Sequence, residues 1–233
     1  MAASGESAST KPKKTELCVV QSVIACLEGV DSLLKKEYII VGSHYDHLGK
    51  RTFPTINGDS TVIYNGADDN ASGVAGVMEL AEKLVSVGNL KRSIMFVLFG
   101  AEEQGGLPGS RYFCDNFPSP LGDIKLMINM DMIGRMDSLN IVYVHTDSPN
   151  SILLKTVGIS YPCISLTFDS QSRMQSDQRS FAAKNIPILY FTTGYHPEYH
   201  TPNDIISTIN FDGQKKLLDM IWDFIVLKAE SVN

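Results

Sequence analysis

Apolar runs without polar alternation constrain the fold of this chain more than any other feature. Four of them are rich in Val, Ile, Leu and Phe, and they span Tyr38–Val41, Ile94–Phe99, Leu126–Met130 and Ile186–Phe191. Strands of this composition suit a sheet that is covered on both faces, which is typical of mainly parallel sheets. The runs therefore predict a central sheet between two layers of helices.

Segments with helical periodicity alternate with these runs. The longest are Ala71–Gly88, which closes on a glycine, and Asp212–Glu230. Shorter helices are predicted over Ser110–Asn116, Ser148–Val157 and Ser176–Lys184. Cys18–Gly29 and Leu139–Thr146 are more typical of edge or antiparallel strands. We predict an α/β fold, a three-layer sandwich with a central mixed, mainly parallel sheet and helices on both faces.

The sequence contains no internal repeat and no mid-chain linker, so we expect a single catalytic domain over residues 17–233. Residues 1–16 are small and polar, which predicts a disordered tail or an expression remnant. They lack the apolar segment of a secretory signal peptide. The compartment is therefore open between the cytoplasm and a leader-stripped secreted or periplasmic form. The cysteines form no CxxC pair, and we expect buried free thiols at Cys18, Cys26, Cys114 and Cys163.

The overall charge narrows the range of partners. The formal net charge is −6, and the isoelectric point is about 5.3. This balance argues against nucleic acid, whose phosphates need a basic surface. No apolar window approaches the 18 or so residues of a membrane span. The oligomeric state is not predicted.

Acidic residues and histidines follow each of the four runs. Because the carboxyl ends of parallel strands lie along one edge of a sheet, we expect these side chains to converge there. They are His44 and Asp46, then Glu102 and Glu103, then Asp131, and finally His196 and His200. A further pair, Asp68 and Asp69, stands just before the helix that begins near Ala71, where the helix dipole favours negative charge.

This set of side chains predicts a metal site. Imidazoles and carboxylates without thiolates suit Zn²⁺ or a neighbouring divalent ion such as Co²⁺ or Mn²⁺. Calcium would need more oxygen ligands, and the HExxH motif of single-helix metalloproteases is absent. The set exceeds the three protein ligands of one catalytic zinc, so two ions with a shared carboxylate use it better. One member of the Glu102–Glu103 pair would then bind metal and the other would accept a proton.

Five segments in this order resemble the co-catalytic dizinc aminopeptidases, a family that also contains glutamate carboxypeptidase-like enzymes and glutaminyl cyclases. The segments are VGSHYDHLG, NGADDNASG, FGAEEQGGLPGSRYF, INMDMIGR and GYHPEYHTPND. The likeness runs from about Val20 to Phe211. The resemblance implies that His44 and Asp131 bind the first metal, that Glu103 and His200 bind the second, and that Asp69 bridges them. It also implies a cis peptide bond after Asp69.

The resemblance assigns the remaining site residues as well. Glu102 matches the general base, and Asp46 matches the acid that orients the His44 ring. His47 and His196 have no ligand role in the pattern, and we expect them to be structural or to line the pocket. Gln178 stands where many relatives have a histidine, so any proton or carboxylate role of that histidine is absent here or belongs to another residue.

The resemblance implies a metal-dependent exopeptidase that hydrolyses the N-terminal peptide bond of peptide or aminoacyl substrates with a water activated by two zinc ions. A glutaminyl cyclase with one metal is the nearest alternative, and a catalytically silent binding homologue is another. An acid-specific carboxypeptidase would need a cluster of basic residues for the carboxylates of its substrate. This function is disfavoured because the candidate arginines of this chain are scattered, at Arg111, Arg135, Arg173 and Arg179. The sequence contains no GxSxG motif, which argues against a serine hydrolase.

Overall fold

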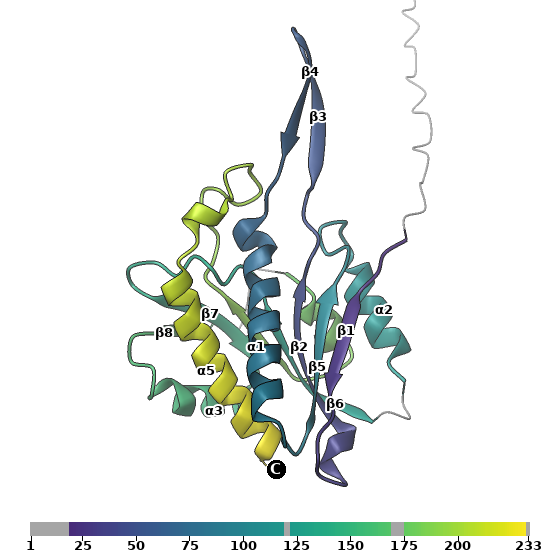
Figure 1. Ribbon diagram of the computed structural model, residues 1–233, viewed down its shortest axis with the longest axis vertical. Coiled ribbons are helices and arrows are strands. Elements are labelled where there is room, and N and C mark those ends of the chain that lie inside the picture. Colours follow the sequence, from purple (N-terminus) through teal and green to yellow (C-terminus); the bar gives the residue numbers. More distant parts are fainter. Residues whose placement is uncertain (1–18, 119–121, 169–174, 232–233) are drawn as a thin grey trace, which may run out of the picture.

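A seven-stranded mixed sheet forms the centre of the computed structural model, which describes residues 19–118, 122–168 and 175–231 (Figure 1). In spatial order the strands are β1 (Val23–Leu27), β5 (Ser93–Phe99), β2 (Glu37–His44), β6 (Asp123–Met130), β9 (Ile188–Thr192), β7 (Ile141–Thr146) and β8 (Ser165–Phe168). The expected tail over residues 1–16 lies outside the described residues.

The four strands predicted as buried lie side by side in the middle of this sheet. β2 pairs in parallel with both β5 and β6, and β6 pairs in parallel with β9. β1 is antiparallel at one edge, and β7 is antiparallel to β9. The segments that follow β2, β5, β6 and β9 therefore begin at the same edge of the sheet, as the sequence predicted.

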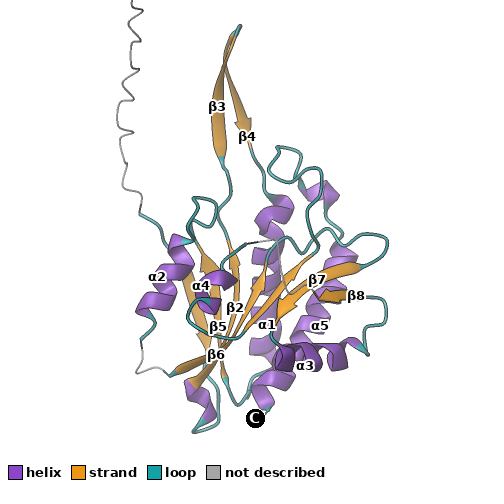
Figure 2. Ribbon diagram, turned by 180° about the vertical axis from the view of Figure 1, so that it is seen from behind, coloured by secondary structure: helices purple, strands orange, loops and turns teal. Residues whose placement is uncertain are grey.

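Helices cover both faces, which confirms the three-layer architecture. One face carries α1 (Gly73–Val87), α3 (Ser148–Gly158) and α5 (Phe211–Glu230), and the opposite face carries α2 (Pro108–Asn116) and α4 (Gln178–Ala182) (Figure 2). Neighbouring residues of β2 point into different layers: Ile39 and Val41 pack in the α1–α5 core, whereas Ile40 packs with Phe113 and Phe181 beneath α2 and α4. This explains why the strand carries no polar alternation.

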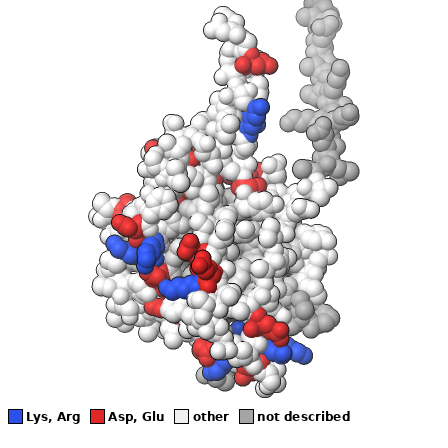
Figure 3. All heavy atoms as spheres, viewed as in Figure 1, with Lys and Arg blue, Asp and Glu red and all other residues white. Residues whose placement is uncertain are grey.

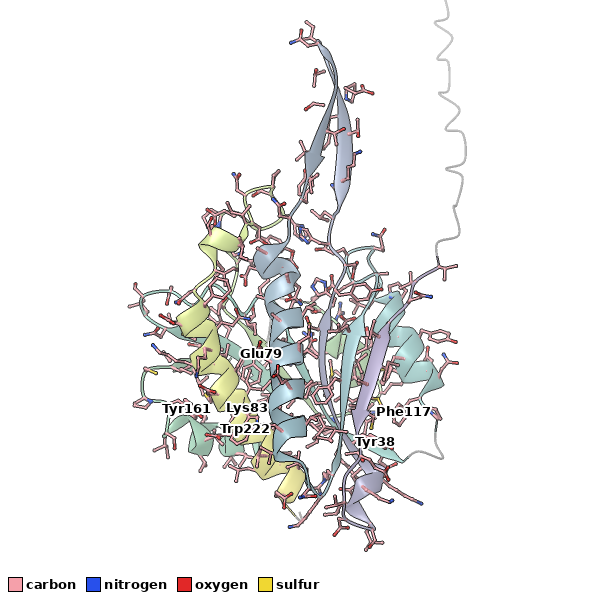
Figure 4. The ribbon with its side chains drawn as sticks, in the orientation of Figure 1. Tyr38, Glu79, Lys83, Phe117, Tyr161 and Trp222 are labelled. Carbon is pink, nitrogen blue, oxygen red and sulfur yellow. The ribbon has the colours of Figure 1, made fainter. Side chains whose placement is uncertain are left out.

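Polar contacts join α5 to its neighbours across the first layer. The Lys83 ammonium on α1 lies 4.2 Å from the centre of the Trp222 ring on α5 and 2.9 Å from Asp219 Oδ1 (Figure 4). Tyr161 donates its hydroxyl hydrogen to Asp223 Oδ2 at 2.6 Å. Acidic and basic side chains are interspersed on the face that Figure 3 shows. On α5, Lys215 also pairs with Asp219, at 2.7 Å.

Several elements differ from the sequence prediction. A two-stranded hairpin, β3 (Lys50–Thr55) and β4 (Gly58–Ile63), projects from the body just after β2 (Figure 1). It was not predicted, because its polar composition shows no buried face. β8 was also missed, and α4 is shorter than the predicted Ser176–Lys184. β7 was predicted as an edge or antiparallel strand; it lies inside the sheet, antiparallel to β9 and parallel to β8.

Three short helical turns complete the described chain: η1 (Leu34–Lys36), η2 (Ala67–Ser72) and η3 (Ile206–Thr208). Cys26, Cys114 and Cys163 are free thiols, but Cys26 and Cys163 are exposed, so the expectation that they are buried was wrong. Cys26 lies on edge strand β1, where the residues from Val23 to Cys26 are all exposed. Cys18 lies outside the described residues. Within those residues, no helix has the length and apolar character that a bilayer crossing requires.

Candidate metal centre

The ends of the central strands deliver the predicted side chains to one place. His44 is the last residue of β2, Asp131 follows β6 directly, and Glu102 and Glu103 follow β5. His200 comes from the loop after β9, and Asp69 lies in η2. The side chains of His44, Asp69, Glu103 and Asp131 are each less than 10% exposed, and that of His200 is 34% exposed.

Two clusters share the carboxylate of Asp69. In the first, His44 Nε2 lies 3.3 Å from Asp69 Oδ1 and 3.5 Å from Asp131 Oδ1. In the second, His200 Nε2 lies 3.1 Å from Asp69 Oδ2 and 3.3 Å from Glu103 Oε1. Each oxygen of Asp69 therefore faces a different cluster, which is the arrangement that a bridging ligand needs.

The turn that holds Asp69 is tied to distant parts of the chain. The buried carboxylate of Asp204 accepts hydrogen bonds from the backbone amides of Asp68 and Asp69, each at 3.0 Å. Asn70 donates its side-chain amide to Ser43 Oγ at 2.9 Å and to the Met130 carbonyl at 3.1 Å. The Asp69–Asn70 peptide bond is cis, as the resemblance implied.

The carboxylate of Asp46 was expected to orient the His44 ring, but Asp46 contacts that ring through its main chain instead. His44 Nδ1 lies 3.1 Å from the main-chain carbonyl oxygen of Asp46 and 3.8 Å from its carboxylate, which is too long for a hydrogen bond. The carboxylate instead accepts the backbone amide hydrogens of Glu102 and Glu103. The carbonyl contact sets the direction of the imidazole, and the carboxylate positions the two glutamates.

Glu102 faces a small cavity at the centre of the site. The cavity has a volume of about 30 Å³, and its walls include His44, Asp69, Asp131 and Tyr195. This volume is enough for a water molecule. Burial raises the pKa of Glu102 to about 8, although the charge of His44 acts in the opposite direction. A carboxyl group with such a pKa beside a water-sized space is suited to proton transfer near neutral pH.

Electrostatic contacts stabilise the charged forms of His44, Asp131 and Glu103. Burial disfavours the charged form of His44, but the nearby Asp131 and Asp69 carboxylates outweigh it and hold the pKa of His44 well above its usual value. Burial likewise opposes ionisation of Asp131 and Glu103. The charge of His44 lowers the pKa of Asp131, and a hydrogen bond with His47 together with the charge of His200 lowers that of Glu103.

The arrangement of donor atoms fits a divalent metal. Asp69 Oδ2 and His200 Nε2 are buried and lie 3.1 Å apart, yet neither makes a hydrogen bond within the described part of the chain. Two such atoms, which face each other with no hydrogen bond between them, are suited to bind one cation. The donors are imidazole nitrogens and carboxylate oxygens, which suit zinc.

Other histidines and the glutamine occupy different surroundings. His196 Nε2 lies 3.4 Å from Asp68 Oδ2, outside both clusters, and His145 lies on β7. Gln178 is buried and accepts a hydrogen bond from Asn129 at 2.9 Å, in keeping with a structural role. Tyr195 and Tyr199 line the cavity, and the Tyr199 ring stacks on His200 with centroids 3.8 Å apart.

Sequence analysis missed two polar residues of the centre. Asp204 is the last residue of the GYHPEYHTPND segment, but only the fold shows its hydrogen bonds to η2. His47 was expected to be structural or to line the pocket, but its contact with Glu103, at 2.9 Å from Nδ1 to Oε1, was not predicted. Its position three residues after His44, in the loop that follows β2, was the one available signal.

Comparison with known proteins places this geometry in a family. Residues 22–225 match the model of Peptidase family M28. Aminopeptidase YwaD of Bacillus subtilis is 31% identical over 180 residues, which cover 72% of this chain and 39% of the relative. The chain spans about half the length, or less, of curated relatives that it matches.

Solved structures share the fold. LapA aminopeptidase of Legionella pneumophila superposes with a TM-score of 0.74 at 23% identity, over 91% of this chain and 56% of that protein. BSAP, a zinc aminopeptidase from Bacillus subtilis, also has a TM-score of 0.74, at 24% identity, over 90% of this chain and 50% of that protein. These similarities confirm the α/β architecture.

Proposed function

Because the chain belongs to peptidase family M28, we propose that it is a zinc-dependent aminopeptidase that removes N-terminal residues from peptide or aminoacyl substrates. One observation carries the proposal: the two clusters share Asp69 and adjoin the cavity that Glu102 lines. YwaD and BSAP, both named as aminopeptidases, support the same activity. The catalytic domain that we propose covers residues 17–233, most of which match the family model.

Two zinc ions are proposed, one for each cluster. His44, Asp69 and Asp131 would hold the first, and Asp69, Glu103 and His200 would hold the second. Zinc is favoured over other divalent ions by the donor set and by the zinc aminopeptidase among the structural relatives. Bound there, zinc would supply hydroxide near neutral pH and positive charge opposite a developing oxyanion.

Glu102 is the proposed general base. Its side chain lines the cavity, where it can take a proton from the attacking water and later donate that proton to the amine that leaves. Asp46 holds the backbone at Glu102 and so sets the direction of the base. The acidic side chains around the cavity would attract the positively charged α-amine of a substrate, which favours cleavage at the N-terminal bond.

Replacement of Glu102 by glutamine separates chemistry from metal binding. Glu102→Gln keeps the size of the side chain but cannot accept a proton, so turnover of an aminoacyl anilide should fall at least about 100-fold. Zinc content should stay near two per chain by elemental analysis. As a matched control, Glu103→Gln should lose zinc together with activity.

Three results would contradict the proposal. The general base is wrong if Glu102→Gln retains turnover. A glutaminyl cyclase is the better assignment if the wild type cyclises a glutaminyl peptide, hydrolyses no aminoacyl anilide and binds one metal. A silent binding homologue is indicated if chelated protein regains neither zinc nor hydrolysis after Zn²⁺ or Co²⁺ is added back.

A further inference from the structure

His47 lies against the second cluster without a role in the resemblance to known peptidases. It belongs to the loop between β2 and the projecting hairpin, and its side chain is 10% exposed. Its Nδ1 atom lies 2.9 Å from Glu103 Oε1 and 3.7 Å from Asp69 Oδ2. It therefore contacts the same Glu103 oxygen that faces His200.

The His47 ring is held in this orientation by its surroundings. It packs against the backbone of Gly66, where a Cβ atom would lie only 2.7 Å from His47 Cγ. The His47 ring also meets the ring of His200 edge-on, with centroids 5.7 Å apart. A glycine at position 66 thus makes room for a ring that points at Glu103.

The distances distinguish a hydrogen-bond donor from a metal ligand. Two ligand atoms of a tetrahedral zinc, each about 2.0–2.1 Å from the metal, lie about 3.3 Å apart. His200 Nε2 matches that spacing, at 3.1 Å from Asp69 and 3.3 Å from Glu103. His47 Nδ1 does not, because 2.9 Å to Glu103 is an ordinary N–H···O distance and 3.7 Å to Asp69 is long.

We propose that His47 is a positioning residue, which donates its Nδ1 hydrogen to Glu103 Oε1 and holds that carboxylate in place for the second zinc. The inference rests on the proposed dizinc function and adds a residue to it. Hydrogen bonds to metal-binding side chains orient them, and their loss typically lowers metal affinity 10- to 100-fold. Without His47, the Glu103 carboxylate would keep its contact with His200 but lose the hydrogen bond of 2.9 Å.

Three substitutions at position 47 test this role by zinc affinity, measured in competition with a chromophoric chelator. His47→Ala should weaken one of the two zinc equivalents about 10- to 100-fold. The zinc affinity of His47→Asn should stay within about threefold of wild type. The asparagine Nδ2 atom is attached to Cγ, as Nδ1 is in histidine, and can donate the same hydrogen bond. His47→Gln places its amide one bond further out and should behave like His47→Ala.

His145→Ala, on β7, is the matched control, and it should leave both zinc affinities unchanged. The absorption spectrum of the Co²⁺-loaded protein provides a second measurement, which His47→Asn should preserve and His47→Ala should alter. Circular dichroism of the metal-free variants checks that each is folded. If His47→Ala does not fold, the comparison of the Asn and Gln variants decides the question.

Each alternative gives a different pattern. Equal loss of affinity in all three variants would mean that His47 is itself a ligand, and the positioning role would be wrong. Unchanged affinity in all three would mean that the contact with Glu103 does not influence the metal. If the wild type fails to bind two zinc ions, the proposed dizinc function fails, whatever the variants show.

Discussion

The carboxylate of Asp46 holds the backbone of Glu102: its Oδ1 atom accepts the amide hydrogen of Glu102 at 3.0 Å. Its Oδ2 atom accepts the next amide, that of Glu103, at 3.1 Å. The loop after β2 thereby fixes the segment after β5. One side chain thus sets the position of both the proposed base and a proposed zinc ligand.

Asp46→Asn should impair this link without a change in side-chain size. An asparagine can offer one carbonyl oxygen to the two amides, so one of them is left without an acceptor, at a cost of about 1–3 kcal/mol in the free energy of unfolding. We expect kcat to fall more than about tenfold, because Glu102 is no longer held in position. Urea denaturation and steady-state kinetics measure the two effects.

Asp31→Asn is a suitable control for this change. Asp31 Oδ1 also accepts two consecutive backbone amide hydrogens, those of Leu33 and Leu34, on the exposed surface. Its substitution should leave kcat unchanged. A normal kcat in Asp46→Asn, despite lower stability, would show that the backbone contact does not serve catalysis.

Asp204 should govern both zinc sites through the backbone of η2. Its buried carboxylate accepts the amide hydrogens of Asp68 and Asp69, and Asp69 faces both clusters. Asp204→Ala leaves those amides without this acceptor, so the metal-free protein should lose about 2 kcal/mol or more of stability. Zinc titration by calorimetry should show weaker binding of both equivalents. Loss of stability with unchanged zinc affinity would contradict the predicted effect of Asp204 on zinc binding.

Asp177 should make the stability of the metal-free protein depend on pH. Burial, reinforced by the Asp131 and Asp46 carboxylates and opposed by His44, raises the pKa of Asp177 from 3.8 to about 7. The native state then holds a proton that the unfolded state releases, so this contribution to stability is full below pH 4 and is lost as the pH rises through 7.

Asp177→Asn removes that dependence because its amide does not titrate. Between pH 4 and pH 7, the stability of wild type relative to the variant should fall by on the order of 4 kcal/mol. Urea denaturation in the presence of chelator measures this difference. Asp123→Asn, at an exposed side chain, is the control substitution. Parallel pH curves for wild type and Asp177→Asn would mean that Asp177 is ionised in the folded protein.

Local sequence predicted the layers of the fold because the pattern of buried strands is local. Ile39 and Ile40 both require apolar surroundings, and their adjacency indicates a strand covered on both faces. The hairpin of β3 and β4 lacked such a signal, since its side chains are mostly exposed and impose no apolar periodicity. The exposure of Cys26 was missed for a different reason: its segment was predicted as an edge or antiparallel strand, but burial of the thiol was expected from the residue type alone.

The order of strands and acidic residues along the chain was enough to predict that His44, Glu102 and Asp131 meet, because parallel strands end at a common edge and carry their next residues there. The contacts that hold these groups in place became apparent only in the folded chain. The bonds from Asp204 to η2, from Asp46 to Glu102 and from His47 to Glu103 join residues between 56 and 136 positions apart. Such contacts depend on the direction of single side chains in three dimensions, which no periodicity along the chain records.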